Sequence, residues 1–376
     1  MEIQFQGELD SLRSWISTTF WVTFNRYREE PHMETFTSAW VCHRDKVEFR
    51  QEQVREAGPG EVRVRIKACG VCGTDIHFFK EFPDEQPVPL GHEVAGIIES
   101  TGPGVSCPAV GTAVVIQNHI PCGMCDACLN QRPDACGNIR TYMDTQAGMA
   151  EYLVVPAAMA IAFEGLDFAT ATLAEPVTVA LDLCREATLR MNDTVLIMGP
   201  GTIGLSCVPI VKRHGASLVV VAGHGLSSTR GAHRKAVATS LGADAFVDTA
   251  DKGWKEKLLA SYPGGFDRVI VTSPPNTIAD GIALAGFRSS IVFDGISYQD
   301  DSVTFGANDF HFQKKRLIAS HAIPNWGFPQ AIGLLKDGTI DPKLLLTHRY
   351  PFKQVAQALQ DYGSSDLEII KIAIEI

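Results

Sequence analysis

The residues best suited to chemistry lie in one short stretch of the chain, between Ala68 and Glu93. This stretch holds a thiol at Cys72, and an imidazole beside a carboxylate at His92 and Glu93, directly after a turn signal over residues 87–91. Cys, His and Glu are all good ligands for zinc, and a catalytic zinc usually takes three protein ligands and leaves one position open. A lone Cys is more often an ordinary core residue. Two further features of the chain favour the zinc site over that alternative.

The first feature is a group of four closely spaced cysteines, namely Cys122, Cys125, Cys128 and Cys136. Two residues between successive cysteines let a loop fold both sulfurs onto one metal ion, and four thiolates complete a closed tetrahedral zinc site. Four unrelated free thiols are a poor explanation of this spacing. Because a closed site has no open position for a substrate, we expect this zinc to hold a surface lobe together.

The second feature is a glycine-rich turn between a strand and a helix. A strand over Thr194–Met198 is followed by GPGTIG and by an apolar stretch to His214, and a second strand follows at Leu218–Val221. The glycines allow the turn and a close approach of the backbone, and the helix N-terminus can bind a pyrophosphate. The motif is weak alone, but the surrounding elements supply its required context. It predicts a dinucleotide site formed by Gly199, Gly201, Thr202, Ile203 and Gly204.

The end of the second strand bears on the choice between NAD and NADP. An NAD site usually carries an acid about 20 residues after the motif, which binds the ribose 2′-hydroxyl. This chain has Gly223 and then His224 there, and Arg230 and Arg234 follow closely. The missing acid and the nearby bases favour the 2′-phosphate of NADP, and a solvated loop in an NAD enzyme is the alternative. We therefore predict a cofactor NAD(P)(H), leaning to NADP, with Gly223, His224 and Arg230 at its adenosine end.

The remaining pattern indicates an α/β chain of two parts. Short alternating or apolar runs such as Val62–Ile66 and Ala113–Ile116 predict a small β-barrel or a folded sheet between about residues 34 and 115. Residues 167–190 are expected to form a helix, with Glu175 at its entrance. Strands and helices then alternate, which is typical of a doubly wound parallel sheet. The last residues hold two helical patterns and a final strand over Ile369–Ile374.

Composition limits the possible partners. The chain has 376 residues, 45% of them hydrophobic, and a formal net charge of −10, which argues against nucleic acid and anionic membranes. No apolar run approaches the roughly 20 residues that a membrane helix needs, and the acidic N-terminus does not resemble a signal peptide. Ten cysteines, four of them at metal-binding spacing, fit a cytoplasmic protein. We expect a homo-oligomer, a dimer or a tetramer.

Residues 1–32 hold an aromatic patch without catalytic groups. They form either an upstream extension or an extra packing element.

Taken together, these motifs carry a family resemblance. The order Cys72-Gly-Thr-Asp, Gly91-His-Glu, four cysteines, Glu175-Pro and GPGTIG resembles the zinc-dependent medium-chain dehydrogenase/reductase superfamily over nearly all of residues 34–376. The chain is most similar to the polyol (sorbitol-like) and threonine dehydrogenase branches, because Glu-Pro stands where classical alcohol dehydrogenases have a Cys ligand. The resemblance implies an N-terminal extension (1–33), a GroES-like catalytic domain (34–178 and 323–376, with a zinc lobe at 117–138) and a Rossmann domain (179–322).

The resemblance also implies roles for single residues. Cys72 and His92 would be ligands of a catalytic zinc. Glu93 and Glu175 would be the acidic ligands, one of them direct and the other direct, water-mediated or exchanging. Asp75 would bind the His92 ring and fix its tautomer. Thr74 and His77 would pass the substrate proton to solvent. Two departures from the family pattern are a longer segment after Gly223 and the lack of an arginine in the segment 322–324.

The predicted function is therefore a zinc-dependent oxidoreductase, with one catalytic and one structural zinc, that transfers a hydride between a secondary alcohol and a nicotinamide cofactor. The alcohol would be a polyol, a sugar alcohol or a sugar acid. Zinc can act as a Lewis acid on the alcohol, and an imidazole with a pKa near 6.5 can relay the proton. The alternatives are oxidation of threonine-type amino alcohols or simple alcohols, and a family member that binds zinc without catalysis. A nucleic-acid-binding zinc ribbon conflicts with the acidic balance.

Overall fold

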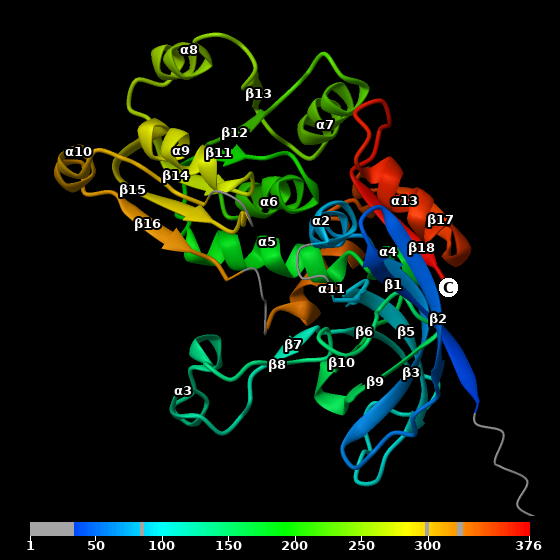
Figure 1. Cartoon of the computed structure of the whole chain (residues 1–376). Coiled ribbons are helices and arrows are strands. Elements are labelled where there is room, and N and C mark those ends of the chain that lie inside the picture. Colours follow the sequence, from blue (N-terminus) through cyan, green and yellow to red (C-terminus); the bar gives the residue numbers. More distant parts are fainter. Residues whose placement is uncertain (1–33, 83–85, 298–300, 322–325) are drawn as a thin grey trace, which may run out of the picture.

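The computed structural model describes residues 34–82, 86–297, 301–321 and 326–376. The predicted N-terminal extension and the segment 322–324 therefore lie outside the described residues. Within the described part of the chain, two sheets of different kinds lie on either side of one long helix (Figure 1). The predicted α/β class, with a β-rich part and a parallel-sheet part, is confirmed.

The first part is β-rich and carries the Ala68–Glu93 stretch. It contains a sheet of order β10-β6-β5-β3-β18-β17, with β9 also paired to β3, and a three-stranded sheet of order β2-β1-β4. The strands from the N-terminal half of the chain are β1 (Thr35–His43), β2 (Lys46–Gln53), β3 (Glu61–Gly70), β4 (Val88–Pro89), β5 (Glu93–Thr101), β6 (Ala113–Ile116), β9 (Tyr152–Pro156) and β10 (Ala160–Ala162). A short pair, β7 (His119–Ile120) with β8 (Arg140–Thr141), brackets the lobe that carries the four cysteines.

The C-terminal segment returns to this β-rich part and completes its sheet. Strand β18 (Lys371–Glu375) pairs antiparallel with β3 and parallel with β17 (Leu346–Pro351). Helix α13 (Val355–Tyr362) packs against α2 (Gly73–Glu81) and against β18. The residues that precede β17 form α11 (Phe328–Lys336) and α12 (Pro342–Leu345). Because β3 lies between β5 and β18, the sheet brings the C-terminal strand close to Glu93 at the start of β5.

The second part is a six-stranded parallel sheet of order β13-β12-β11-β14-β15-β16. The chain starts at the central strand β11, moves outward to β13, and then crosses back to β14, which is the doubly wound pattern. The strands are β11 (Thr194–Met198), β12 (Leu218–Gly223), β13 (Ala245–Asp248), β14 (Phe266–Val271), β15 (Ala285–Phe293) and β16 (Arg316–Ala319), and the helices between them are α6 (Thr202–Arg213), α7 (Thr229–Ser240), α8 (Trp254–Ser261), α9 (Ile278–Leu284) and α10 (Ala307–Phe312). The strand predicted at Thr194–Met198 has the same bounds in the structure.

Helix α5 (Ala174–Glu186) runs between the two parts (Figure 1) and packs on α6, α11, β5 and β15. The single helix expected over residues 167–190 is wrong, because the structure has a short α4 (Phe168–Ala171) before α5. Thr172 and Leu173 form a turn between the two helices, in which the Leu173 amide donates to the carbonyl of Thr170 (3.1 Å). The buried faces of α5 and α6 form one apolar core with the parallel sheet, and the β-rich part has a core of its own. Among the described residues, no helix combines the length and apolar character needed to cross a bilayer.

Candidate active site

The four cysteines come together as the spacing predicts. Their sulfur atoms all lie within 4.8 Å of one another, and the closest pairs, Cys125 with Cys128 and with Cys136, are 3.5 and 3.8 Å apart. Four sulfurs at about 2.3 Å from one zinc ion would lie about 3.8 Å apart, so the group fits that ion. The turn at Gly123 needs a left-handed backbone (φ +76°). Backbone amides of Met124 and Cys125 point at the Cys122 sulfur and lower its pKa to about 6.

A second group of candidate metal ligands lies in a cavity between the two parts of the chain. Cys72, His92 and Glu93 place a sulfur, a ring nitrogen and a carboxylate oxygen within 4.8 Å of one another. Cys72 is the N-cap of α2, two residues after the end of β3, and Glu93 is the first residue of β5, directly preceded by His92. The pairing of β3 with β5 sets Gly70 opposite Glu93, which brings two segments twenty residues apart into one site.

Glycines make room for these side chains. Gly91, which precedes His92, has φ +86°, and a Cβ there would lie 2.6 Å from the sulfur of Cys69. A Cβ at Gly70 would lie 1.9 Å from the Oε2 atom of Glu93. A side chain at either position would therefore displace the residues that the cluster needs.

The role predicted for Asp75 needs correction. Its two carboxylate oxygens accept the backbone N–H groups of Cys72 (2.8 Å) and of Gly91 (2.9 Å). The structure thus shows bonds from Asp75 to the backbone on both sides of the cluster, and not the expected bond to the ring of His92. One buried carboxylate fixes the separation of Cys72 and His92 through their backbone segments.

Negative groups predominate around the ring of His92. Burial disfavours a charged ring, but the Cys72 sulfur, Glu175 and Asp75 outweigh burial and raise the pKa of His92 well above its ordinary value. Burial also raises the pKa of Glu175 to about 7. Such shifts are expected where anionic groups share a dry site without enough positive charge, and a divalent cation would supply that charge. The donor set of Cys72, His92 and Glu93 therefore fits a metal ion such as zinc.

Glu93 has a partner that sequence reasoning missed. The ammonium group of Lys371, the first residue of β18, binds the Oε1 atom of Glu93, and the two side chains are 2% and 1% exposed. Burial alone would lower the pKa of Lys371, but the Glu93 carboxylate more than offsets burial and raises it. The Oε2 atom of Glu93 keeps no partner among the described residues and is the oxygen left for a metal. A lysine within the apolar run over residues 369–374 was the available signal, because lysine is rarely buried unless paired.

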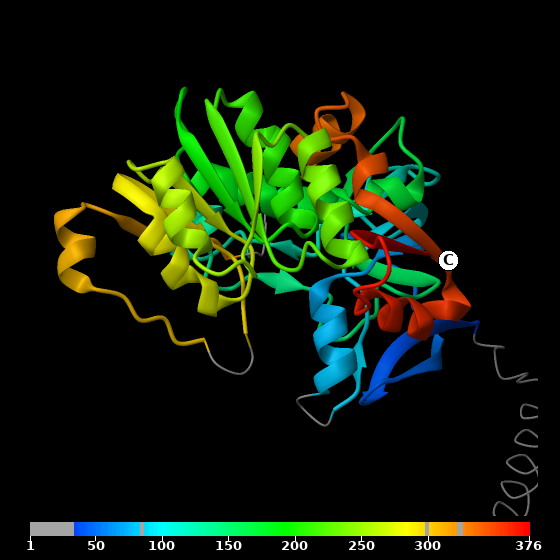
Figure 2. The same cartoon turned by 90° about the horizontal axis from the view of Figure 1, so that it is seen from above.

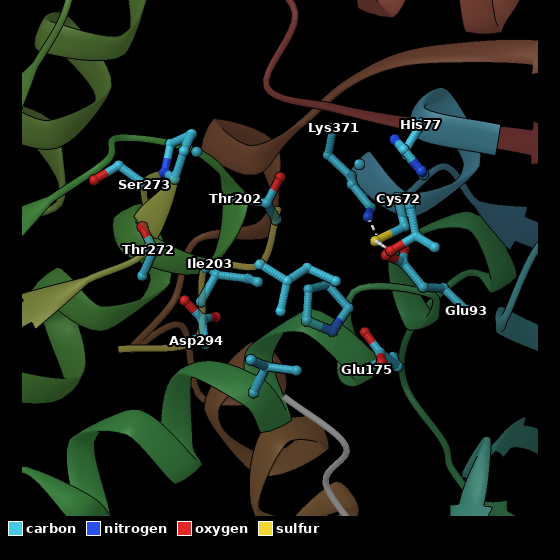
Figure 3. Close-up of a pocket in the computed structure, with 18 of the residues that line it drawn as sticks. Cys72, His77, Glu93, Glu175, Thr202, Ile203, Thr272, Ser273, Asp294 and Lys371 are labelled. Carbon is cyan, nitrogen blue, oxygen red and sulfur yellow. Dashed lines mark hydrogen bonds and ion pairs between the residues drawn. The ribbon is translucent and has the colours of Figure 1, made fainter. Parts of the chain in front are cut away.

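Glu175 lies in the wall of the same cavity but outside the three-residue cluster (Figure 3). Its Oε1 atom accepts a hydrogen bond from the side-chain amide of Asn118 (2.9 Å). Thr74 and His77 also line the cavity, and the Thr74 hydroxyl lies 3.8 Å from the Cys72 sulfur. The structure therefore gathers all six predicted catalytic residues around one cavity of about 530 Å³.

The opposite wall of the cavity comes from the parallel sheet and from the N-terminus of α6. Gly201, Thr202 and Ile203 line it, together with Thr272, Ser273 and Asp294 at the ends of β14 and β15 (Figure 3). A Cβ at Gly204 would lie 2.1 Å from the carbonyl oxygen of Gly199, so this glycine allows the close helix–strand packing of a dinucleotide turn. Free amide groups at the start of a helix can bind a phosphate group, which gives the motif its physical basis.

The residues predicted for the adenosine end lie away from the cavity lining. Gly223 ends β12, His224 is exposed, and Arg230 stands in the first turn of α7. The Arg230 guanidinium donates to the carbonyl of Tyr362, and the Arg230 amide donates to the carbonyl of Ser365 (3.0 Å). In this structure Arg230 therefore holds the C-terminal segment against α7, and its contact with a cofactor stays a prediction.

Comparisons with known proteins agree with this arrangement. Residues 58–165 match the alcohol dehydrogenase GroES-like domain, and residues 202–337 match the zinc-binding dehydrogenase model. The chain is 28% identical to L-galactonate-5-dehydrogenase of Escherichia coli K12, over 88% of this chain and 96% of that protein.

Two solved structures share both the fold and detectable sequence identity. A short chain alcohol dehydrogenase from E. coli CFT073, complexed with NADH, superposes with a TM-score of 0.82 and 26% identity over 91% of this chain and 99% of that chain. A zinc-binding dehydrogenase from Sinorhizobium meliloti 1021, bound to NADP, superposes with a TM-score of 0.80 and 27% identity, over 91% of this chain and 100% of that chain. With its two matched domains and these relatives, the chain belongs to the zinc-dependent medium-chain dehydrogenase/reductase superfamily.

Proposed function

We propose that this protein is a zinc-dependent oxidoreductase that transfers a hydride between a secondary alcohol and a nicotinamide cofactor. The observation that carries the proposal is one cavity with two different walls. Cys72, His92 and Glu93 form a cluster that could hold a metal ion on one wall, and the N-terminus of α6 lies on the other. An alcohol in this cavity would lie between a metal site and a dinucleotide site.

The residues of this chain have distinct parts in such a reaction. When bound, zinc would supply a Lewis acid for the alcohol oxygen, and the nicotinamide would accept the hydride. Cys72, His92 and Glu93 would hold the metal, and the ammonium group of Lys371 binds the Oε1 atom of Glu93 and holds that side chain in place. Thr74 and His77 would take the alcohol proton toward solvent, since a hydroxyl and an imidazole in series can relay protons.

The proposed substrate is a polyol, a sugar alcohol or a sugar acid. Support comes from the Glu175-Pro pair at the cavity wall, which is the polyol-branch feature, and from the sugar-acid dehydrogenase among the relatives. The cavity offers hydroxyl, carboxyl and imidazole groups that can bind a polyhydroxylated chain, among them Thr74, His77 and Glu175.

We further propose a preference for NADP. The last residue of β12 is Gly223, which offers no acid to a ribose 2′-hydroxyl. A side chain would not fit at this position, because a Cβ there would lie 2.5 Å from Pro200. The nearby Asp248 already accepts backbone N–H groups from Gly225 (3.0 Å), Leu226 (2.9 Å) and Ala250 (2.9 Å). Its carboxylate is therefore bound to the loop.

The proposal also includes a cytoplasmic location, because all ten cysteines are free in the structure, as expected in a reducing compartment.

The test combines metal analysis with a substrate screen. Purified protein should contain two zinc ions per chain, one for each cluster, and should oxidise at least one polyol or sugar acid with NADP or NAD. The screen should also include threonine and simple secondary alcohols. Turnover of threonine alone would replace the proposed substrate class. Bound zinc and cofactor without turnover of any alcohol would instead indicate a non-catalytic member of the family.

A further inference from the structure

Asp294 is a buried carboxyl group in the cavity wall that the proposed reaction does not use. It directly follows β15 and is 8% exposed. Its Oδ1 atom is enclosed and has no hydrogen-bond partner among the described residues. The side chain lines the same wall as Thr272 and Ile203, across the cavity from Cys72 and Glu93 (Figure 3). An isolated buried carboxylate is costly unless it gains a proton or a positively charged partner.

The order of the strands indicates which half of a dinucleotide would lie next to Asp294. The pyrophosphate belongs at the N-terminus of α6, which follows the central strand β11. The adenosine half extends toward β12, on one side of that strand. The nicotinamide half must then extend over β14 and β15, on the other side. Asp294 stands at the carboxyl end of β15, where ligands bind in such sheets.

We propose that Asp294 faces the nicotinamide ring and, as a carboxylate, stabilises the oxidised, cationic ring relative to the reduced, neutral ring. This inference rests on the proposed function, because it requires a nicotinamide cofactor. The cationic ring would provide the positive partner that Asp294 lacks. The residue would thereby position and bias the cofactor, without taking part in the proton relay or in metal binding.

The groups that face Asp294 determine when it carries a charge. Burial, with a smaller contribution from the carboxylate of Asp182, raises its pKa to about 7. Asp182 comes from α5, the thiol of Cys207 comes from α6, and the end of β14 contributes only the hydroxyls of Thr272 and Ser273. Without cofactor, the carboxyl therefore holds a proton for much of the time at neutral pH. Binding of the cationic ring should displace that proton, whereas binding of the neutral ring should not.

The experiment measures dissociation constants in the absence of substrate. Zinc-loaded wild-type protein and Asp294→Asn would be titrated with the oxidised and with the reduced cofactor between about pH 6 and pH 8. In the wild type, the ratio of the oxidised to the reduced dissociation constant should fall by about tenfold as the pH rises, the change that corresponds to a shift of one pKa unit. In Asp294→Asn the ratio should stay constant, and at the higher pH it should exceed the wild-type ratio by a similar factor.

Asp182→Asn serves as the matched variant, because it keeps the Asp294 carboxyl and its burial but removes a nearby charge that contributes to the raised pKa. The pH transition of the ratio should then move to lower pH, an effect that a purely structural role would not produce. A pH-independent ratio in the wild type overturns the inference even if Asp294→Asn does not fold. Equal ratios in the wild type and Asp294→Asn overturn it while the proposed function stands. Failure of the wild type to bind either cofactor form overturns both.

Discussion

At the scale of single residues, the buried pair of Lys371 and Glu93 fixes one of the candidate metal ligands. Replacing Lys371 with Met should lower the free energy of unfolding by about 3–5 kcal/mol, because it leaves a buried carboxylate without its partner. The same change should weaken metal binding, since Lys371 holds the Glu93 side chain in place through its Oε1 atom. Chemical denaturation and zinc analysis would measure both effects.

The control for Lys371→Met is Arg349→Met on the neighbouring strand. Arg349 binds Asp167 (3.0 Å) and Glu375 (3.1 Å), but its side chain is 45% exposed. Exposed ion pairs contribute about 0–1 kcal/mol, so this variant should be nearly as stable as the wild type. Equal losses in the two variants would contradict the importance of the buried pair.

Replacement of His77 and replacement of Cys72 should reduce the turnover rate to different extents. Replacing His77 with Gln should slow turnover about 10²-fold, the lower end of what one acid–base group contributes, and should flatten its rise with pH. Replacing Cys72 with Ala should abolish turnover and catalytic zinc together. Steady-state rates over a pH series and metal content would distinguish these cases. If both variants lose turnover equally while both retain zinc, His77 has a larger role than a proton relay.

At the scale of elements, the end of β12 decides how cofactor choice can be tested. An Asp at Gly223 would clash with Pro200, since a Cβ there would lie 2.5 Å from its ring. The next position, His224, is exposed and can accept an acid. His224→Asp should lower kcat/KM for NADP by about tenfold or more through repulsion of the 2′-phosphate, because charge-assisted contacts are strong. The comparison of kcat/KM for both cofactors in the wild type and the variant is the measurement. A wild type that strongly favours NAD would rule out the NADP preference.

The four-cysteine lobe and the Cys72 cluster should lose zinc at different rates. The lobe offers four sulfurs and no open position, whereas the cluster offers one sulfur, one nitrogen and one oxygen. A mild chelator should therefore abolish turnover before it changes the melting temperature. Readdition of zinc should restore turnover. Unfolding that accompanies the first loss of metal would show that the assignment of the two sites is reversed.

At the scale of the whole molecule, apolar surface near the edge of the parallel sheet supports the expected homo-oligomer. Phe287 on β15 and Phe312 on α10 are 57% and 73% exposed, and α10 projects from the body of the molecule (Figure 2). Strand β16 forms the edge of this sheet in the described part of the chain. Exposed apolar patches beside an open edge are typical of interfaces.

The prediction is that the wild type forms at least a dimer and that Phe287→Asp with Phe312→Asp weakens it. A charge on this surface would have to be buried in the interface, at a cost that favours the monomer. Val110→Asp, at an apolar position that is 61% exposed in the β-rich part, is the control and should leave the assembly unchanged. Light scattering at several protein concentrations would measure the mass. A monomeric wild type would contradict the expectation.

The sequence by itself determined the features that depend on neighbours along the chain. The spacing of the four cysteines limits how far apart their sulfurs can lie, and the structure brings them together. The glycine turn between a strand and a helix also depends only on residues close together in the chain. Accordingly, β11 and α6 form where the pattern predicts them. The order of these motifs was also sufficient to indicate the family. Local chain geometry leaves few other conformations for such segments.

Only the tertiary structure decided what depends on residues far apart in the chain. Lys371 meets Glu93 because β18 returns to pair with β3, 278 residues after Glu93. Arg230 contacts Tyr362 because α7 packs against the C-terminal segment. The sequence alone could not show this contact, which competes with the predicted binding of a cofactor by Arg230. Asp75 binds the backbone amides of Cys72 and Gly91, which are nineteen positions apart in the chain. Long-range pairing of strands determines these contacts, and no local pattern in the sequence specifies which partner a buried charge will find.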